Sequence, residues 1–223
     1  MNRRTVPHFY YIQPLSEDWT GSSLEGDDTA PGGTASVRFQ ALDHWALGAR
    51  YQSKVDLKLT GEINHALDAS AEITLPSSFT AGLANTSIKN LTLELNVVWT
   101  EWSVYDELAV KTAAGTQSAP KDWDDVWSIR AGGEYALGEQ LALRAGYVWD
   151  ESPVPGTTRA PELPGSNRQM VTGGVGWANG RLGVDAAYAH LWAKTVDMGS
   201  IYPLEGKFKT ATHVVSLSAS YAF

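Results

Sequence analysis

Alternation of apolar and polar side chains runs through most of the chain and limits the folds it can adopt. In residues 209–223, one set of alternate positions is mostly apolar and ends in two aromatic residues, Tyr221 and Phe223. The other set is small and mostly hydroxylated. Because a β-strand sends successive side chains to opposite faces, this stretch is predicted to be a strand with two unlike faces. The strand fits either a soluble sandwich or a membrane barrel whose apolar face meets lipid.

The same period of two predicts about ten strands in the whole chain, most of them about ten residues long. The clearest alternation spans residues 45–59, where only Ser53 interrupts the apolar set. Residues 16–33, 61–76 and 105–122 are expected to be loops or polar connections, the last with a strand extension at its start. The expected strands are 8–15, 34–42, 45–59, 78–84, 91–103, 126–136, 141–150, 169–177, 181–193 and 209–223.

Loop lengths and aromatic residues favour the membrane barrel over the sandwich. Short turns, such as Gly138-Glu139 and the strong turn dipeptide Asn179-Gly180, alternate with long polar loops. Outer-membrane barrels alternate short periplasmic turns with long outside loops in the same way. The chain has nine Trp and nine Tyr, and many lie at predicted strand ends, as two interfacial girdles require. We therefore predict an all-β fold, a transmembrane antiparallel up-and-down β-barrel.

Composition excludes several other classes of protein. The 223 residues include no Cys, so neither a disulfide framework nor a thiolate metal site is possible. The net charge of −8 argues against a nucleic-acid partner, because binding phosphate needs a basic surface. No apolar run approaches the roughly 18 residues of a membrane-spanning helix.

Several motifs together resemble the FadL family of outer-membrane transporters for long-chain fatty acids and other hydrophobic compounds. The most specific ones lie between Trp123 and Arg168, and the resemblance covers nearly the whole chain. The motifs are Pro7-His8-Phe9-Tyr10-Tyr11, Pro14-Leu15-Ser16-Glu17-Asp18-Trp19, Tyr51-Gln52-Ser53-Lys54-Val55, Leu75-Pro76, Trp99-Thr100-Glu101-Trp102, Trp123-Asp124-Asp125, Gly133-Glu134-Tyr135, Asp150-Glu151-Ser152-Pro153-Val154-Pro155, Leu163-Pro164, Asn167-Arg168 and Tyr221-Ala222-Phe223.

The resemblance implies an outer-membrane channel or transporter for long-chain fatty acids or other hydrophobic compounds, in the bacterial cell outer membrane. Family barrels have about fourteen strands, together with an N-terminal hatch that has no counterpart here, so a truncated form is expected. Residues 1–223 are expected to form a single β-barrel domain. Within it, 1–33 would supply an early strand plus a loop, and 34–223 roughly the last eight strands. The alternative is a non-transporting structural or interaction barrel with ligand-binding outer loops.

The predicted inward faces suggest a ligand site. Arginine suits a fatty-acid carboxylate because its planar fork can hold both oxygens, and Arg130 and Arg144 are predicted to face the lumen. Apolar side chains at inward positions could meet an acyl chain, with Val98 and Trp102 about 13 Å apart on one strand. Charge pairs and ordinary packing between lumenal side chains remain the alternative. The candidate ligand-binding residues are Val98, Trp102, Arg130, Arg144, Val148, Met170 and Val214.

The sequence gives little support to an enzyme. The five histidines are scattered without metal-ligand spacing, and a Ser–His arrangement around His190 is a weak alternative. We therefore expect no catalytic residues, no metal and no cofactor. The expected partners are a long-chain fatty acid or another hydrophobic small molecule and outer-membrane lipid, with the protein a monomer.

Overall fold

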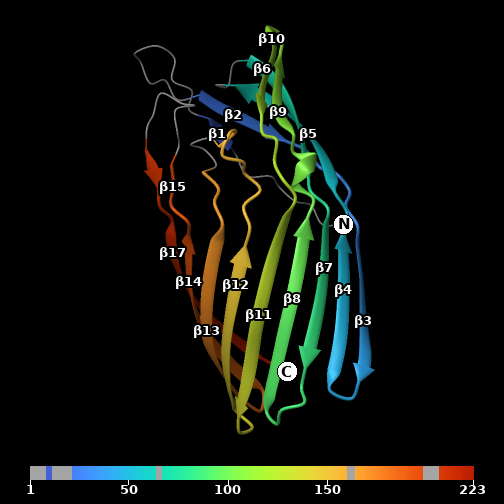
Figure 1. Cartoon of the computed structure of the whole chain (residues 1–223), viewed down its shortest axis with the longest axis vertical. Coiled ribbons are helices and arrows are strands. Elements are labelled where there is room, and N and C mark those ends of the chain that lie inside the picture. The colour runs from blue at the N-terminus through green and yellow to red at the C-terminus, as the bar shows by residue number, and fades with distance from the viewer. Residues whose placement is uncertain (1–8, 12–21, 64–66, 160–163, 198–205) are drawn as a thin grey trace.

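Nine antiparallel strands form the main sheet of the protein. The computed structural model describes residues 9–11, 22–63, 67–159, 164–197 and 206–223. The strands of the main sheet stand side by side as a curved wall, with short turns at the lower end (Figure 1). Their order is β17-β14-β13-β12-β11-β8-β7-β4-β3. Their bounds are Thr34–Leu42 (β3), Trp45–Gln52 (β4), Ser78–Asn85 (β7), Leu91–Thr100 (β8), Val126–Leu137 (β11), Leu141–Asp150 (β12), Arg168–Asn179 (β13), Leu182–Ala193 (β14) and Ala211–Tyr221 (β17).

The predicted up-and-down order is confirmed, because sequence neighbours in this sheet pair antiparallel. In particular, β17 pairs with β14, from Trp192 opposite Ala211 to Leu182 opposite Tyr221. The tight turns at Gly138 and Gly180 have φ of 73° and 61°, a conformation that glycine adopts without strain. Large apolar side chains on one face are exposed, as lipid contact requires; examples are Phe39, Leu47, Tyr51, Phe79, Leu95, Ile129, Leu143, Val175 and Leu217.

The described part of the main sheet is open along β3 and β17. Because its nine strands alternate in direction, the two edge strands run the same way. Direct closure would therefore be a parallel pair, whereas an up-and-down barrel closes antiparallel through an odd number of further strands. The chain's first strand was predicted to pair with β17 in a closed barrel, but the described part of this strand pairs elsewhere. Its described part, β1 (Phe9–Tyr11), pairs with β2 (Ser22–Asp27).

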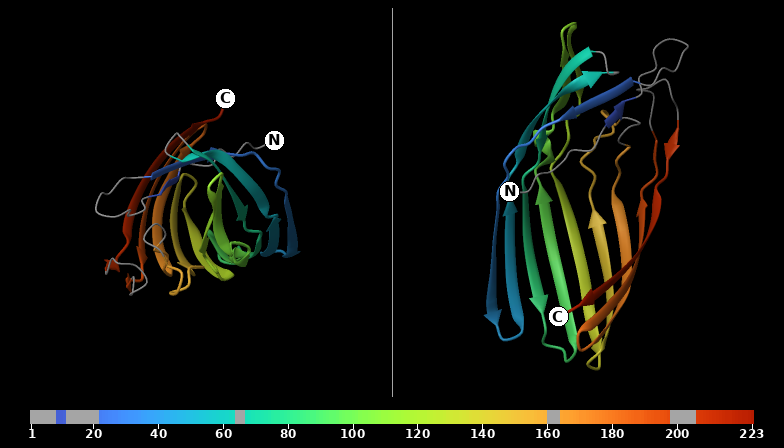
Figure 2. Two further views of the ribbon diagram at one scale, coloured as in Figure 1. Left: turned by 90° about the horizontal axis from the view of Figure 1, so that it is seen from above. Right: turned by 180° about the vertical axis from the view of Figure 1, so that it is seen from behind.

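A second sheet of six strands lies at the upper end, in the order β1-β2-β5-β6-β9-β10. Seen from above, the main sheet forms an arc, and strands of the second sheet cross over part of the space within it (Figure 2). The remaining strands of this sheet are β5 (Val55–Ile63), β6 (Leu67–Leu75), β9 (Glu107–Thr112) and β10 (Gly115–Pro120). A short pair, β15 (Val196–Asp197) with β16 (Lys207–Phe208), and a 3-10 turn, η1 (Trp102–Val104), complete the elements.

The second sheet corrects several predictions. Residues 45–59 are two strands in two sheets, because Ser53 breaks the pairing: its N–H donates to the Gly33 carbonyl and its hydroxyl accepts from the Gly33 N–H, both at 2.9 Å. The predicted polar connection over 61–76 contains β6, whose Leu67, Ala69, Ala71 and Ile73 alternate with polar residues. Residues 105–122 form the β9–β10 hairpin, and residues 16–33 contain β2.

One face of the second sheet is apolar and covered. Leu57, Leu59, Ala69 and Ala71 are buried, and they form much of the apolar core of the described residues. The opposite face of β5 and β6 is exposed and polar, with an ion pair of 3.2 Å between Lys111 Nζ and Glu72 Oε1. The upper end of the wall therefore carries a folded layer rather than open loops.

Candidate functional site

The pairing register places a basic residue and three apolar residues in one row on the inner face of the main sheet. Arg130 on β11 lies opposite Val148 on β12, which lies opposite Met170 on β13. Met170 in turn lies opposite Leu191 on β14. Directly opposed residues share a face of the sheet. With strands about 4.8 Å apart, the row from Arg130 to Leu191 is roughly 14 Å wide.

The three side chains of this apolar row (Val148, Met170 and Leu191) are half-buried. Val98 lies close to the row, since it is opposite Ser128 on β11, two positions along the strand from Arg130. These residues come from five strands of three different hairpins, so only the assembled sheet brings them together. The arrangement is an apolar track with a cation at one end.

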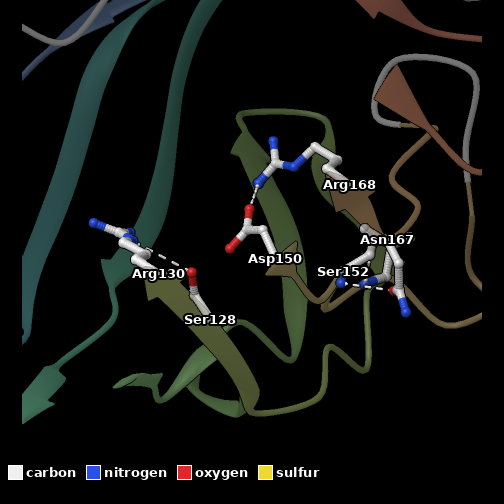
Figure 3. Close-up of polar contacts among 7 residues, drawn as sticks. Ser128, Arg130, Asp150, Ser152, Asn167 and Arg168 are labelled. Carbon is white, nitrogen blue, oxygen red and sulfur yellow. Dashed lines mark hydrogen bonds and ion pairs between the residues drawn. The ribbon is translucent and has the colours of Figure 1, made fainter. Parts of the chain in front are cut away.

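Arg130 is the cation with the fewest contacts in this region. Its Nε lies 3.4 Å from Ser128 Oγ, a distance at the outer limit of a hydrogen bond (Figure 3). Within the described ranges Arg130 forms no ion pair. Its side chain is exposed, whereas Ser128 is buried. An anion could therefore approach the guanidinium without displacing a carboxylate.

Arg144 lies in a different environment. Its Nε donates to Glu134 Oε2 and its Nη1 donates to Asp185 Oδ1, both at 2.6 Å. This three-strand bridge (Glu134, Arg144 and Asp185) crosses β13 at Gly176, where a Cβ would lie 2.5 Å from Asp185 Oδ1 and 2.7 Å from Arg144 Nη1. Two carboxylates already neutralise this guanidinium, which makes it a weaker candidate than Arg130 for holding a ligand anion.

Another ion pair lies two positions along β12 and β13 from Val148 and Met170. Asp150 and Arg168 are opposite each other on β12 and β13 and form a close ion pair. Just beyond, the Ser152 N–H donates to Asn167 Oδ1 at 3.0 Å. Figure 3 shows both contacts together with Arg130 and Ser128; Asp150 ends β12 and Arg168 begins β13. Arg168 is thus engaged by a carboxylate, as Arg144 is.

Trp102 does not lie on the strand face predicted for it. Strand β8 ends at Thr100, and Trp102 opens the 3-10 turn, so it does not share a strand face with Val98. Its ring packs edge-on against Trp123, with centroids 5.0 Å apart, and Trp123 also packs against Tyr105 at 4.9 Å. The chain turns at this point because the carboxylate of Asp125 accepts the Ser103 N–H at 3.0 Å. Trp102 therefore belongs to an aromatic cluster at the end of β8.

Val214 also lies apart from the apolar row. It is opposite Ala189 on β14, and the row through these two residues contains Thr172. Its side chain is 51% exposed, next to the open edge of β17. Leu191, in contrast, belongs to the row but was missed from the sequence. The sequence contained the information needed to find it. Leu191 is six residues from Asp185 on the same strand, and an even separation places both side chains on the inward face.

Two negative findings concern the described residues alone. No helix among them has both the length and the apolar character needed to cross a membrane. No group of three or more His, Cys, Asp or Glu side chains is arranged to hold a metal ion in this part of the chain.

Comparison with known proteins identifies the family. The family model described as outer membrane protein transport protein (OMPP1/FadL/TodX) matches residues 8–223. The chain belongs to this family. The crystal structure of a Pseudomonas aeruginosa FadL homologue matches with a TM-score of 0.84 and 26% identity, over 90% of this chain and 54% of that one. The family resemblance predicted from sequence is therefore confirmed.

A solved structure of lower identity shows the same fold, and a curated relative matches by sequence. The toluene transporter TbuX of Ralstonia pickettii matches with a TM-score of 0.61 and 16% identity, over 92% of this chain and 52% of that one. The long-chain fatty acid transport protein of Escherichia coli O6:H1 is 22% identical over 75% of this chain and 44% of its own length. The chain spans about half the length of the curated relatives it matches.

Membership of the family gives the chain its location and general class. The protein is a bacterial outer-membrane β-barrel protein of the FadL type. The family comprises transporters and channels for hydrophobic compounds rather than enzymes. The alternative of a non-transporting structural or interaction barrel is not favoured by these comparisons.

Proposed function

We propose that the whole protein moves long-chain fatty acids across the bacterial outer membrane, and that the apolar row is part of the ligand path. Arg130 would hold the carboxylate, while Val148, Met170 and Leu191 would contact the acyl chain. Residues 1–223 would act as one barrel domain and as a monomer surrounded by outer-membrane lipid. The proposed function involves neither catalysis nor a cofactor.

The observation that carries this proposal is the direct register of Arg130 with the apolar row. A polar lumen would favour water at every inward position, whereas three successive apolar side chains favour an apolar ligand. Burial of each ligand CH₂ would contribute about 0.8 kcal/mol. A track roughly 14 Å wide corresponds to a large part of an extended acyl chain.

The charge of Arg130 favours a carboxylate over a neutral hydrocarbon as ligand. A guanidinium binds a carboxylate through two parallel hydrogen bonds. An aromatic hydrocarbon, such as the toluene named for the relative TbuX, offers no comparable partner. Arg144 and Arg168 already have carboxylate partners, so Arg130 is the arginine of this region best placed for an added anion.

The test is a fluorescent fatty-acid titration of the detergent-solubilised chain. We expect affinity to rise with acyl length. It should fall by roughly 10- to 100-fold for the methyl ester and for Arg130→Gln, since a charge-assisted hydrogen bond contributes about 1.5–3 kcal/mol. Met170→Ser should reduce the dependence on chain length. Arg50→Gln is the matched control, because Arg50 is an inward arginine on β4, away from the row.

Three results would count against the proposal in different ways. Equal affinity of the acid and its methyl ester would remove Arg130 from the site. An affinity independent of acyl length would remove the apolar row. Equal losses from Arg50→Gln and Arg130→Gln would show that overall lumenal charge, rather than this site, attracts the ligand.

A further inference from the structure

A cluster of polar aromatic side chains lies on the outward face of β14 and β17. We define this outer His cluster as Tyr188, His190, Trp192 and His213. His190 and His213 are opposite each other, and their rings stack with centroids 4.5 Å apart. The ring of His190 also stacks on Trp192 at 5.4 Å, and the hydroxyl of Tyr188 lies 2.7 Å from His213 Nδ1.

These side chains point away from the lumen. Asp185 on β14 reaches Arg144 on the inner face, and residues at odd separations from Asp185 on the same strand face the other way. His190 lies opposite Val171, which is among the exposed apolar residues of the lipid-facing side. Two imidazoles therefore occupy a face where most other residues of the sheet are apolar.

The cluster lies at the upper end of the sheet, where lipid headgroups are expected. Trp192 and Trp149 occupy the upper ends of β14 and β12 and share one row with Gln169. Tryptophan at a barrel interface marks the headgroup level. Polar side chains in the hydrocarbon would be unfavourable, but at this depth they can contact the polar part of a lipid.

The hydrogen bonds leave donors available. When the Tyr188 hydroxyl donates to His213 Nδ1, the imidazole carries its proton on Nε2 and can donate from there. Nδ1 of His190 is buried and has no hydrogen-bond partner among the described residues. The ring of His190 can therefore meet a ligand only through Nε2. In the tautomer that carries its proton on Nε2, His190 offers an N–H donor on the same outward face as His213.

Positive charges flank this end of the two strands. Lys194 follows β14 and Lys209 precedes β17, and both are exposed. The Lys194 N–H donates to the Asn167 carbonyl at 3.0 Å, which fixes the backbone there. An exposed acidic residue, Asp197, also lies nearby, but it is opposite Lys207 in the short β15–β16 pair. Donors and cations together complement an anion.

We propose that the outer His cluster, with Lys194 and Lys209, binds the phosphate of a lipid headgroup at this end of the sheet. The imidazole N–H groups would donate to phosphate oxygens, the lysines would provide charge, and Trp192 would pack against the upper part of the acyl chains. This site lies outside the lumen and does not depend on the proposed transport function.

The test uses the whole chain in octyl glucoside, titrated with phosphatidylglycerol and followed by native mass spectrometry. We expect saturable binding that His190→Gln/His213→Gln weakens about tenfold and that Lys194→Gln/Lys209→Gln also weakens. His44→Gln is the matched control, because His44 lies in the turn between β3 and β4 at the opposite end of the sheet. Diacylglycerol, which lacks the phosphate, should bind no better to the native chain than to the double histidine variant.

A second measurement uses the native chain alone, so its result does not depend on whether a variant folds. Histidine ¹⁵N resonances of the native chain should shift for His190 and His213, and not for His44, when phosphatidylglycerol is added. Equal affinity of phosphatidylglycerol and diacylglycerol would overturn the proposal. Binding of inorganic phosphate as tight as that of the lipid would do the same, because it would indicate a site for a free anion.

Discussion

The three-strand bridge of Glu134, Arg144 and Asp185 is predicted to stabilise the sheet. Its ion pairs join side chains of β11, β12 and β14 and pass over β13, which contributes no charged group. Arg144→Gln removes both ion pairs and leaves two carboxylates without a cation, on β11 and β14, with β12 and β13 between them. Hydrogen bonds to charged groups contribute about 1.5–3 kcal/mol, whereas exposed ion pairs contribute about 0.2–1 kcal/mol. The three side chains are 44–46% exposed, so we expect about 1 kcal/mol for each pair and about 2 kcal/mol for the bridge.

The assay is urea unfolding of the chain in lipid vesicles, followed by tryptophan fluorescence. Arg144→Gln should lower the free energy of unfolding by about 2 kcal/mol. A cycle of Arg144→Gln, Asp185→Asn and the double variant should give a coupling energy of about 1 kcal/mol. Gly176→Ala should also destabilise, by roughly 1 kcal/mol, because its methyl group would occupy the space between the two charged groups.

Gly173→Ala is the matched control for the glycine. A Cβ at Gly173 would meet nothing within 4 Å, and alanine is favoured over glycine in a strand by roughly 0.5–1 kcal/mol. This variant should therefore be neutral or slightly stabilising. A coupling energy near zero, or equal effects of the two glycine substitutions, would refute the role assigned to the bridge.

Two further predictions concern the faces of the sheet and the junction between the two sheets. Leu143→Arg, on the lipid-facing side, should lower the free energy of unfolding in bilayers by about 2 kcal/mol. Thr172→Arg, on the lumenal side, should lower it much less. Similar losses from the two variants would show that the faces are misassigned. Ser77 is 4% exposed and donates to Glu101 Oε2 at 2.7 Å, so Ser77→Ala should cost about 1 kcal/mol in the same assay, and an unchanged midpoint would contradict this role.

Local alternation was sufficient to predict most of the main sheet. Strand β12 has the predicted bounds, Leu141–Asp150, and β11, β13 and β14 differ from prediction by only one or two residues at either end. The alternation of apolar and polar residues depends only on whether each face of a strand meets lipid or water. It can therefore be seen in the sequence of each strand taken alone. The predicted lumenal direction of Arg144 comes from the same signal.

The second sheet was missed because alternation does not say which strands pair. Residues 45–59 keep one apolar face throughout, yet the chain changes sheet at Ser53, where the bond to Gly33 comes from a residue 20 positions earlier. The apolar side chains of β6 alternate as clearly as those of β12, but the polar residues around β6 made the stretch resemble a loop in composition. Their pairing with β5 and β9 is a tertiary property.

The sequence by itself determined the all-β class, the two faces of each long strand and the inward direction of Arg130, Val148 and Met170. Only the tertiary structure decided which inward residues meet. Register between strands set Arg130 in a row with Met170 and Leu191, joined Arg144 to Asp185 across Gly176, and left Val214 in another row. The physical reason is that alternation is fixed within one strand, whereas a site across several strands depends on backbone pairing between distant segments.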